Sequence, residues 1–428
     1  MPKIILPGIE LPLKRWKFII KPGKSKMRVL FSITNLLVGG AQTFLVALAN
    51  EMSQSNKVYI YCFCESQIDR EITGRISPRV KLIIFPPLLR RFAPRLQKIF
   101  SIFKIKRNAA FTLRKLHLQI MGKWLKIDII HSQLYHSDEF ITDVFRDRKI
   151  PVIITEHGCY NYVIREKLGQ KESLIGIFKR VDGVAHISDQ NKEHIIELTG
   201  NKEIQFRKIN NGIPRFVPAP GISQELRKSL QINSHDFVFG MIARGIKEKG
   251  WEIAAAAFKE LQTETGMPIH LIFIGDSPYL QELKQKVGAE AVNNIHFLGS
   301  ISDPVKWVDC FDIGLLPTYF AGESLPMTII EYLACAKPII ATNAGCIKEM
   351  IRCESENAGI IFAYHTDFKI NVQHLKEAMA VYLQNPGTLE KHRATAQQCF
   401  SKYDIKIICE NYQQFYELQL TTKSNRNN

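Results

Sequence analysis

The sequence predicts an α/β protein made of two halves in tandem, for three reasons. Short apolar, β-branched runs alternate with stretches of helical periodicity along most of the 428 residues, which is typical of a mostly parallel sheet covered by helices. This alternation occurs over 27–212 and again over 236–400, and the segment 213–235, which contains glycine and prolines, separates the two. Ligands of such sheets bind at the carboxyl ends of the strands, so we expect a binding cleft between the halves.

Each expected strand is a short run of Val, Ile, Leu or Phe bounded by turn residues. In the first half these runs are 27–33, 57–63, 80–85, 127–131, 151–155, 183–188 and 205–209, with helices at 43–52, around 140–145 and from 189. In the second half the expected strands are 237–243, 270–275, 295–299, 312–317, 338–342 and 359–363. Helical patterns cover 224–230, 251–262, 279–287, 304–311, 326–334, 372–383, 389–403 and 405–418.

Two terminal segments fall outside the halves. Residues 1–26 place a proline-broken apolar part before a basic part, the reverse of a signal peptide, so we expect an N-terminal extension. Residues 401–428 form a C-terminal helix that could pack back on the first half. No apolar run approaches the roughly 18 residues of a transmembrane helix. Nine irregularly spaced cysteines suit neither a disulfide framework nor a zinc site, so we expect reduced thiols in the cytosol.

The net charge of +16 suggests an anionic partner: nucleic acid, a membrane surface or an anionic substrate. Residues 88–126 concentrate this charge, because they carry Lys and Arg throughout and no Asp or Glu. Phe, Ile, Leu and Trp recur among them at helical spacing, which indicates an amphipathic segment that binds an anionic membrane surface. The alternative is a helix pair packed on a core with a solvated basic face. Nucleic-acid binding is not expected, since no nucleic-acid module accompanies the charge.

The stretch Phe311–Glu349 reads as strand, loop, helix, strand and loop. Glu323 lies in the loop before the helix, Glu331 lies within it, and Pro326 stands where the helix begins. The positive end of a helix is an anion site, and two carboxylates around it suit a ligand that carries both hydroxyls and phosphate. The alternative is an ordinary βαβ unit with two solvated glutamates.

Other loops at strand ends carry polar groups. Gly39-Gly40 lies between a strand and a helix, a layout in which backbone N–H groups approach phosphate, although a tight turn is the simpler reading. Arg244 and Lys249 share the loop after the first strand of the second half, where they could bind an anion or form a solvated basic loop. His157 ends the strand 151–155, where it could contact a ligand or satisfy a backbone group.

Together these residues resemble glycosyltransferase family 4, a group of retaining glycosyltransferases with the GT-B fold. The resemblance covers roughly 28–400 and consists of motifs in the expected order, namely Gly39-Gly40-Ala41-Gln42, Asn211-Gly212-Ile213, Arg244 with Lys249-Gly250, Gly275-Asp276, Phe297-Leu298-Gly299 and the Glu-x7-Glu pair Glu323 and Glu331. Two departures concern the sugar pocket. The family often has Gly-Gly where this chain has Gly345-Cys346, and Phe-Gly where it has Ser324-Leu325.

The resemblance implies two Rossmann-like domains that face each other across a cleft, with the acceptor side at 27–212 and the nucleotide-sugar donor at 236–400. It implies that Arg244 and Lys249 stabilise the leaving diphosphate, that Glu323 and His157 face the transferred sugar, and that Glu331 binds the donor ribose. Further donor contacts are implied for Gly39, Gly40, Gly275, Ser324, Leu325 and Pro326. In this type of enzyme the departing phosphate is thought to take the acceptor's proton, so neither glutamate is a general base.

The expected substrates are a UDP- or GDP-sugar and a glycan or lipid-linked acceptor, with no cofactor and no metal. His131 and His136 bracket a strand-end loop and could face the acceptor. A cytoplasmic enzyme bound to the inner face of the membrane through 88–126, in polysaccharide, lipopolysaccharide or glycolipid synthesis, is the natural setting. The alternatives are another GT-B activity, such as a nucleotide-sugar epimerase or a phosphorylase, and a non-catalytic sugar-nucleotide-binding subunit.

Overall fold

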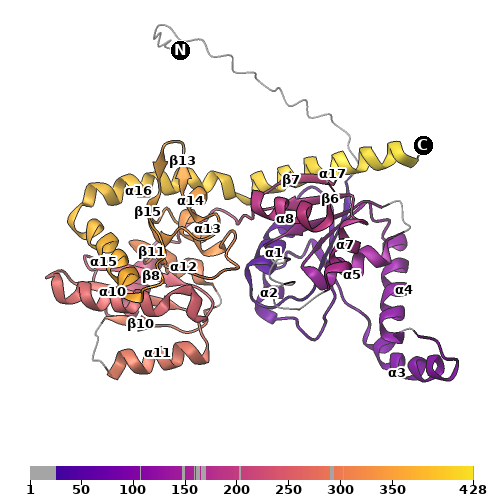
Figure 1. Cartoon of the computed structure of the whole chain (residues 1–428), viewed down its shortest axis with the longest axis horizontal. Helices are drawn as coiled ribbons and strands as arrows, with labels where there is room; N and C mark the ends of the chain where they lie inside the picture. The colour runs from indigo at the N-terminus through magenta and orange to yellow at the C-terminus, as the bar shows by residue number, and fades with distance from the viewer. Residues whose placement is uncertain are drawn as a thin grey trace, which may run out of the picture.

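The computed structural model describes residues 26–427 except 107, 147–149, 159, 161–163, 165–169, 202–203, 290–293 and 302. Two α/β domains lie side by side, each built on one parallel sheet (Figure 1). This confirms the predicted fold class. The expected N-terminal extension lies outside the described residues, apart from Lys26.

The N-terminal domain contains a seven-stranded sheet in the order β3-β2-β1-β4-β5-β6-β7. All six pairings are parallel. Because both faces are covered by helices, the strands read as near-continuous apolar runs. Their bounds are β1 Arg28–Ile33, β2 Lys57–Cys62, β3 Val80–Ile83, β4 Ile129–Gln133, β5 Val152–Glu156, β6 Gly183–His186 and β7 Gln205–Lys208.

The C-terminal domain repeats the design with a six-stranded parallel sheet in the order β10-β9-β8-β11-β12-β15. A short antiparallel pair, β13 and β14, lies apart from it. The bounds are β8 Phe237–Ile242, β9 Ile269–Ile274, β10 Ile295–Phe297, β11 Ile313–Leu316, β12 Ile339–Thr342, β13 Arg352–Cys353, β14 Glu356–Asn357 and β15 Gly359–Phe362.

Helices alternate with these strands. In the N-terminal domain and linker they are α1 Gly40–Met52, α2 Arg70–Gly74, α3 Pro87–Ile102, α4 Ala109–Trp124, α5 Tyr135–Val144, α7 Lys171–Phe178, α8 Asp189–Thr199 and α9 Ile222–Ser229. In the remainder they are η1 Lys247–Lys249, α10 Trp251–Glu264, α11 Pro278–Ala289, α12 Pro304–Val308, α13 Met327–Ala334, α14 Ile347–Met350, α15 Phe368–Gln384, α16 Pro386–Cys399, η2 Phe400–Tyr403 and α17 Ile405–Asn427.

Several helix bounds differ from the sequence prediction by three residues or more, among them those of α1, α12 and α17. Helix α1 begins at Gly40 rather than at residue 43, directly after the extended Gly39. Helix α12 ends at Val308, short of the predicted residue 311. Helix α17 continues nine residues past the predicted end at 418, to Asn427, through a polar stretch that shows no apolar periodicity to follow.

The chain crosses between the domains twice at one place. Ile213 forms an isolated parallel bridge with Asp404, in which Ile213 donates to the carbonyl of Tyr403 at 3.1 Å and Ile405 donates to the carbonyl of Ile213 at 3.0 Å. A Cβ on Gly212 would lie 2.6 Å from the Tyr403 carbonyl oxygen, so glycine lets the two crossings approach. The domains are therefore joined by a two-stranded connection rather than by a single linker.

Helix α17 packs on the N-terminal domain after the second crossing, as Figure 1 shows in yellow. Its buried face joins the core around β1 and α1 through Ile405, Ile408, Cys409, Tyr412, Phe415 and Tyr416. The hydroxyl of Tyr416 lies 2.6 Å from Nδ1 of His131, and the hydroxyl of Tyr412 lies 2.9 Å from that of Thr155. The last helix of the chain thus completes the core of the first domain.

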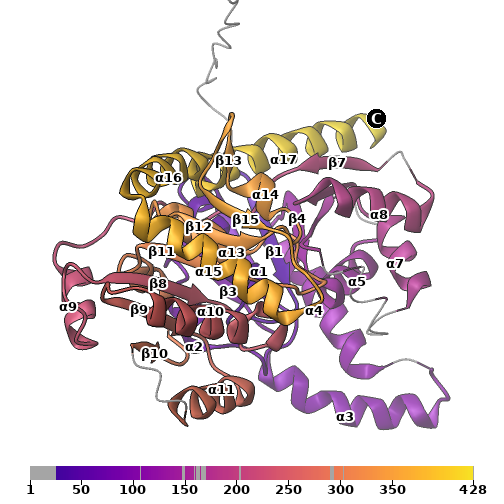
Figure 2. The same ribbon diagram turned by 60° about the vertical axis from the view of Figure 1, so that its left-hand side comes forward.

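Residues 88–126 form most of the hairpin α3–α4, which projects from the N-terminal domain in both views (Figures 1 and 2). Arg114 fastens it to the domain through Glu65, with N–O distances of 2.6 and 3.0 Å. Its exposed apolar side chains are Leu88, Phe92, Ile99, Ile102, Phe103, Ile105, Phe111, Leu116, Ile120 and Trp124. Within the described residues, no helix is long and apolar enough to cross a bilayer.

The buried hydroxyl of Tyr416 gives a stability prediction. We expect Tyr416→Phe to lower the free energy of unfolding by about 1–3 kcal/mol, because it leaves the wholly buried Nδ1 of His131 without its partner. Tyr364→Phe is the matched control, since Tyr364 is exposed and should change stability by less than about 0.5 kcal/mol. Urea denaturation followed by circular dichroism measures both, and equal stabilities of the two variants would refute the role given to this hydroxyl.

Candidate functional site

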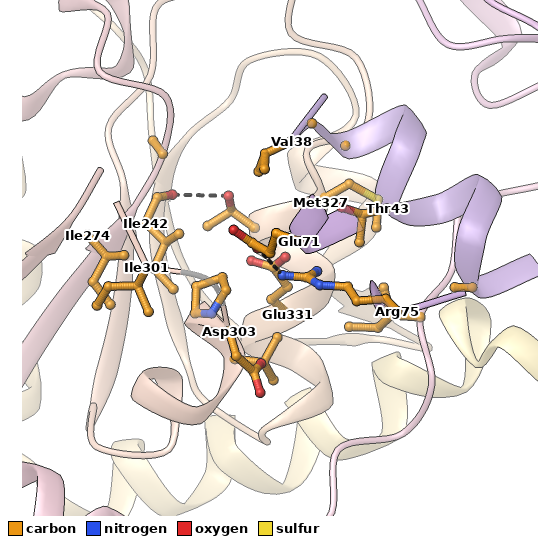
Figure 3. A pocket seen from close by; sticks show the side chains of 18 of the residues that line it. Val38, Thr43, Glu71, Arg75, Ile242, Ile274, Ile301, Asp303, Met327 and Glu331 are labelled. Carbon is orange, nitrogen blue, oxygen red and sulfur yellow. Dashed lines mark hydrogen bonds and ion pairs between the residues drawn. The ribbon is translucent and has the colours of Figure 1, made fainter. Parts of the chain in front are cut away.

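A cavity of about 730 Å³ lies where the two domains meet. From the N-terminal domain it is lined by the start of α1 and by α2, and from the C-terminal domain by the loops after β8 and β9 and by α13 (Figure 3). Of the residues predicted from sequence, it brings together Gly39, Gly40, Arg244, Gly275 and Glu331. The cleft expected at the carboxyl ends of the strands is present.

Gly40, at the start of α1, lets the two domains approach. A Cβ on Gly40 would lie 3.0 Å from Cγ of Met327, the first residue of α13 in the other domain. Helix α13 begins at Met327, with Pro326 as its N-cap and no side chain capping it. The N-terminal ends of α1 and α13 therefore meet at the cavity, where unpaired backbone N–H groups favour an anion.

Lys249 and Glu323 form a buried ion pair. Nζ of Lys249 lies 2.5 Å from Oε2 of Glu323, and the two side chains are 8% and 7% exposed. The hydroxyl of Thr318 donates to the same oxygen at 3.0 Å. Burial lowers the pKa of Lys249, and the charge of Glu323 opposes this shift. Sequence reasoning assigned the two residues to separate parts of a ligand, and it did not foresee that they would contact each other.

The loop that carries Arg244 and Lys249 is held by backbone constraints. Gly250 adopts a φ of +84°, and a Cβ there would lie 2.1 Å from the carbonyl oxygen of Pro317, so only glycine fits. The indole of Trp251 donates to the carbonyl of Arg244 at 3.0 Å. The Arg244 side chain is exposed at the cavity, with its guanidinium 5.1 Å from the ring centre of Phe320. Arg244 therefore lies at the cavity, whereas Lys249, on the same loop, pairs with Glu323 and does not line the cavity.

Glu331 faces the cavity from α13 (Figure 3). Although part of the residue is accessible to the cavity, burial raises the pKa of its carboxyl to about 7. The positive charge of Arg75 opposes this shift and the carboxylate of Asp303 adds to it. Glu331 consequently changes its charge near neutral pH, which an exposed glutamate would not do.

Arg75 and its neighbours were missed by sequence reasoning. Arg75 follows α2, and its guanidinium lies 2.5 Å from the carboxylate of Glu71 one helical turn earlier. Figure 3 shows it reaching from the N-terminal domain toward Glu331. Nothing in the local sequence REITGR marks a cavity residue, because the short helix reads as an ordinary surface turn.

His157 lies outside the lining of the cavity, at the contact between the domains. Its Nε2 is 3.2 Å from Oε1 of Gln133, at the end of the neighbouring strand β4. Burial lowers the pKa of His157 to about 4, and the Asn211 side chain opposes the shift. The imidazole is therefore neutral at physiological pH and can act as a hydrogen-bond donor or acceptor but not as a cation.

The loop after His157 touches the loop that carries Glu323. A Cβ on Gly158 would lie 2.8 Å from Cβ of Ser324, which belongs to the other domain. Gly345 makes a similar approach, since a Cβ there would lie 2.6 Å from the carbonyl oxygen of Glu323. Leu325 is buried in the core of the C-terminal domain, so its side chain supports the loop rather than facing the cavity.

The expectation that His131 could face an acceptor is wrong. His131 is wholly buried, with Nε2 at 2.6 Å from the hydroxyl of Thr155 and Nδ1 bonded to Tyr416. Burial lowers its pKa to about 3, so it is a neutral core residue. His136 is exposed in the first turn of α5. The sequence could not separate the two, because a strand-end histidine reads the same whether it faces a cleft or a packed helix.

No cluster of three or more His, Cys, Asp or Glu side chains that could hold a metal ion occurs among the described residues. Asp138 is buried, with its Oδ2 2.5 Å from the hydroxyl of Tyr160, and burial raises the pKa of its carboxyl to about 8. Asp143 lies 2.8 Å from Nζ of Lys115, in an ion pair between α5 and α4. Both carboxylates therefore have structural neighbours.

Two family models match the chain in succession. The model described as Glycosyltransferase Family 4 matches 38–215, and the model described as Glycosyl transferases group 1 matches 222–399. A relative from Campylobacter jejuni, N,N'-diacetylbacillosaminyl-diphospho-undecaprenol alpha-1,3-N-acetylgalactosaminyltransferase, is 25% identical over 69% of this chain and 78% of its own. The alpha-monoglucosyldiacylglycerol synthase of Streptococcus pneumoniae is 26% identical over 73% of this chain and 70% of its own.

Solved structures share the fold over nearly the whole chain. The Anabaena protein HepE in complex with UDP and glucose superposes with a TM-score of 0.70 at 17% identity, over 91% of this chain and 99% of its own. A glycosyltransferase from Rickettsia africae superposes with a TM-score of 0.71 at 16% identity, over 93% and 99% of the two chains. The architecture is therefore GT-B, as expected. Since the two family models divide the two domains between them and together match most of the sequence, the protein belongs to glycosyltransferase family 4.

Proposed function

We propose that this protein is a retaining glycosyltransferase that moves a sugar from a nucleotide-diphosphate sugar to a glycan or lipid-linked acceptor. The observation that carries the proposal is the interdomain cavity, which gathers the helix start at Gly40, the cation Arg244 and the carboxylate Glu331 around one volume. Its size is within the range of small-molecule sites. A diphosphate is bound by cations and N–H donors, while the hydroxyls of a ribose donate to an acceptor such as a carboxylate. The cavity holds both kinds of group.

The leaving diphosphate gains negative charge as the glycosidic bond breaks, so its stabilisation is the main requirement of the reaction. Arg244 supplies a fork-shaped donor at the cavity, and Lys249 supplies a second positive charge on the same loop. The N-terminal end of α1 adds backbone donors from the other domain. On this proposal these groups, with no metal ion, stabilise the leaving charge.

The ion pair with Lys249 suggests how Glu323 acts. Lys249 Nζ lies 2.5 Å from the carboxylate of Glu323 and gives this buried side chain a positive partner. On this proposal Glu323 holds sugar hydroxyls and opposes positive charge that develops at the anomeric carbon. Lys249 in turn keeps its charge next to the leaving phosphate. The pair would therefore place a negative group at the sugar and a positive group at the phosphate.

The donor and the acceptor are proposed from relatives. HepE was crystallised with UDP and with UDP-glucose, which supports a UDP-sugar as donor, although a GDP-sugar suits the same cavity. The Campylobacter and Streptococcus relatives are named for a diphospho-undecaprenol-linked acceptor and for a glycolipid product. We infer a lipid-linked or glycan acceptor from these names.

Hairpin α3–α4 supports peripheral attachment to an anionic membrane surface. Ile102 and Phe103, at the turn between its helices, are 75% and 71% exposed, and Trp124 at the end of α4 is 75% exposed. Its sequence between 88 and 126 contains no acid. Exposed apolar side chains among basic ones suit the headgroup region of a bilayer rich in anionic lipid. An enzyme held there would meet a lipid-linked acceptor at the inner face of the membrane.

Arg244 provides the sharpest test of leaving-group stabilisation. We expect Arg244→Ala to lower kcat about 10²- to 10³-fold, the effect of removing one preorganised donor at a developing charge. Lys247→Ala is the matched control, because Lys247 is an exposed cation of the same loop that does not line the cavity. Release of UDP from a UDP-sugar measures turnover. Similar rates for the two variants would refute the role of Arg244.

Lys249→Ala should also lower turnover, but it leaves Glu323 buried without its partner and therefore lowers the stability of the protein as well.

Glu331 gives a pH prediction. Its folded pKa is raised to about 7, and the ionised carboxylate is the form that accepts two ribose hydroxyls. Nucleotide affinity should therefore rise as the pH rises through about 7, and at pH 6 it should be roughly tenfold weaker than at pH 8. Isothermal titration with UDP measures this, and Glu331→Gln corrects for the titration of the phosphate itself. A wild-type profile parallel to that of Glu331→Gln would contradict the assignment.

The membrane proposal predicts salt-sensitive binding to vesicles. Liposomes that contain phosphatidylglycerol should sediment the protein at low salt and release it at high salt, because attraction of basic residues to anionic lipid is screened. The triple variant Ile102→Ser, Phe103→Ser, Trp124→Ser should bind at least tenfold more weakly. Val217→Ser is the control, since Val217 is 78% exposed away from the hairpin. Equal binding of the triple variant and the control would exclude the hairpin as the attachment surface.

A further inference from the structure

Four buried polar atoms lack hydrogen-bond partners at the contact between the domains. Among the residues that the structure describes they are Nε2 of Gln133, Nδ1 of His157, Oδ1 of Asn211 and Oγ of Ser324. An unpaired buried polar atom is unfavourable, so a group of them indicates a place that a ligand satisfies. Gln133 and Asn211 were not among the residues expected to form the site.

The residues that carry these four atoms lie at or beside His157. Gln133 is wholly buried at the end of β4, and its carboxamide oxygen lies 3.2 Å from Nε2 of His157. Asn211 is 4% exposed, and hydrogen bonding between its side chain and the same ring raises the pKa of His157, while its Oδ1 has no partner. Ser324 packs against Gly158, the next residue after His157. The N-terminal domain, the interdomain crossing and the C-terminal domain each contribute to this cluster.

The chemistry of the cluster selects its ligand. Its members are two carboxamides, a hydroxyl and an imidazole that burial keeps neutral, so it offers no charge to a phosphate or a carboxylate. Gln133 has an unused N–H donor and Asn211 an unused acceptor. A hydroxyl both accepts and donates, so one hydroxyl can satisfy both residues. The cations Arg244 and Lys249 and the carboxylate Glu331 belong to other parts of the site.

We propose that Gln133 and Asn211 are specificity residues that bind a hydroxyl of the transferred sugar, alongside His157 and Ser324. This deepens the proposed function and rests on it. Ser324 follows Glu323, the residue assigned to the transferred sugar, so the cluster lies at the sugar end of the donor. At this cluster the loop after His157 contacts Ser324 of the other domain through Gly158.

A site built to bond a hydroxyl rejects a ligand that lacks it, because its buried polar atoms then stay unpaired. The cluster therefore adds affinity for the sugar without affecting the nucleotide. This distinguishes Gln133 and Asn211 from residues that merely support the fold, whose loss would weaken the binding of both parts of the donor.

The test compares each nucleotide sugar with its own nucleotide diphosphate. UDP, UDP-glucose, UDP-galactose, UDP-N-acetylglucosamine, GDP and GDP-mannose are titrated into the full-length protein by calorimetry. The variants are Gln133→Met and Asn211→Leu, which keep side-chain volume and remove the polar atoms. Thr142→Val is the matched control, because Thr142 is a buried hydroxyl of the same domain whose partners are backbone carbonyls within α5.

We expect the wild-type protein to bind at least one nucleotide sugar more tightly than the corresponding nucleotide diphosphate. Gln133→Met and Asn211→Leu should each reduce that gain by about 10- to 100-fold, while their affinity for the diphosphate changes less than twofold and Thr142→Val behaves as wild type. A gain that survives in both variants overturns the inference. The inference is also overturned if the wild-type protein binds a diphosphate but binds none of these nucleotide sugars more tightly. That result would leave the proposed nucleotide site standing. Failure of every nucleotide to bind overturns the proposed function and the inference together.

Asn211 lies beside the interdomain crossing, so Asn211→Leu could disturb the fold. Thermal unfolding identifies that case, and Gln133→Met, away from the crossing on β4, then decides the question alone.

Discussion

The double crossing at Ile213 and Ile405 is the constraint on which the rest of the site depends. Two backbone hydrogen bonds tie the outgoing and returning chain together, and Gly212 has no Cβ to hold them apart. The carboxyl ends of both sheets therefore face one shared space. Helix α17 continues from this point into the core of the N-terminal domain, so the relative position of the domains is connected to the packing of the first domain itself.

Close approach across that space relies on small residues at the contacts. Gly40 meets Met327 where the N-terminal ends of α1 and α13 come together, and Gly158 meets Ser324 beside His157. A side chain at Gly158 would collide with Ser324, and one at Gly40 would press on the side chain of Met327. At each contact the glycine matters because it has no side chain, which leaves room for a residue of the opposite domain.

Burial at the cleft changes the charge properties of its residues in different ways. Lys249 and Glu323 are both almost fully buried, yet they neutralise each other at 2.5 Å. Among the residues that the structure describes, no cation forms an ion pair with Glu331, and burial raises the pKa of its carboxyl to about 7. His157 loses its charge entirely in the physiological range. The contact between the domains consequently has a charged region, with Arg244 in the cavity and the Lys249–Glu323 pair behind it, and a neutral polar region beside His157.

The sequence alone determined the two α/β halves, the order of their elements and the motif residues, because apolar periodicity and strand-end glycines are local signals. Most strand bounds differ by one or two residues from prediction, and the residues Gly40, Arg244, Gly275 and Glu331 do line one cavity. Only the tertiary structure decided which of these side chains meet. It paired Lys249 with Glu323, placed Arg75 opposite Glu331, buried His131 under Tyr416, and left Gln133 and Asn211 with unsatisfied atoms beside His157. The physical reason is that burial and pairing depend on what lies across the domain contact, and residues as far apart as 131 and 416 carry no local sign of each other.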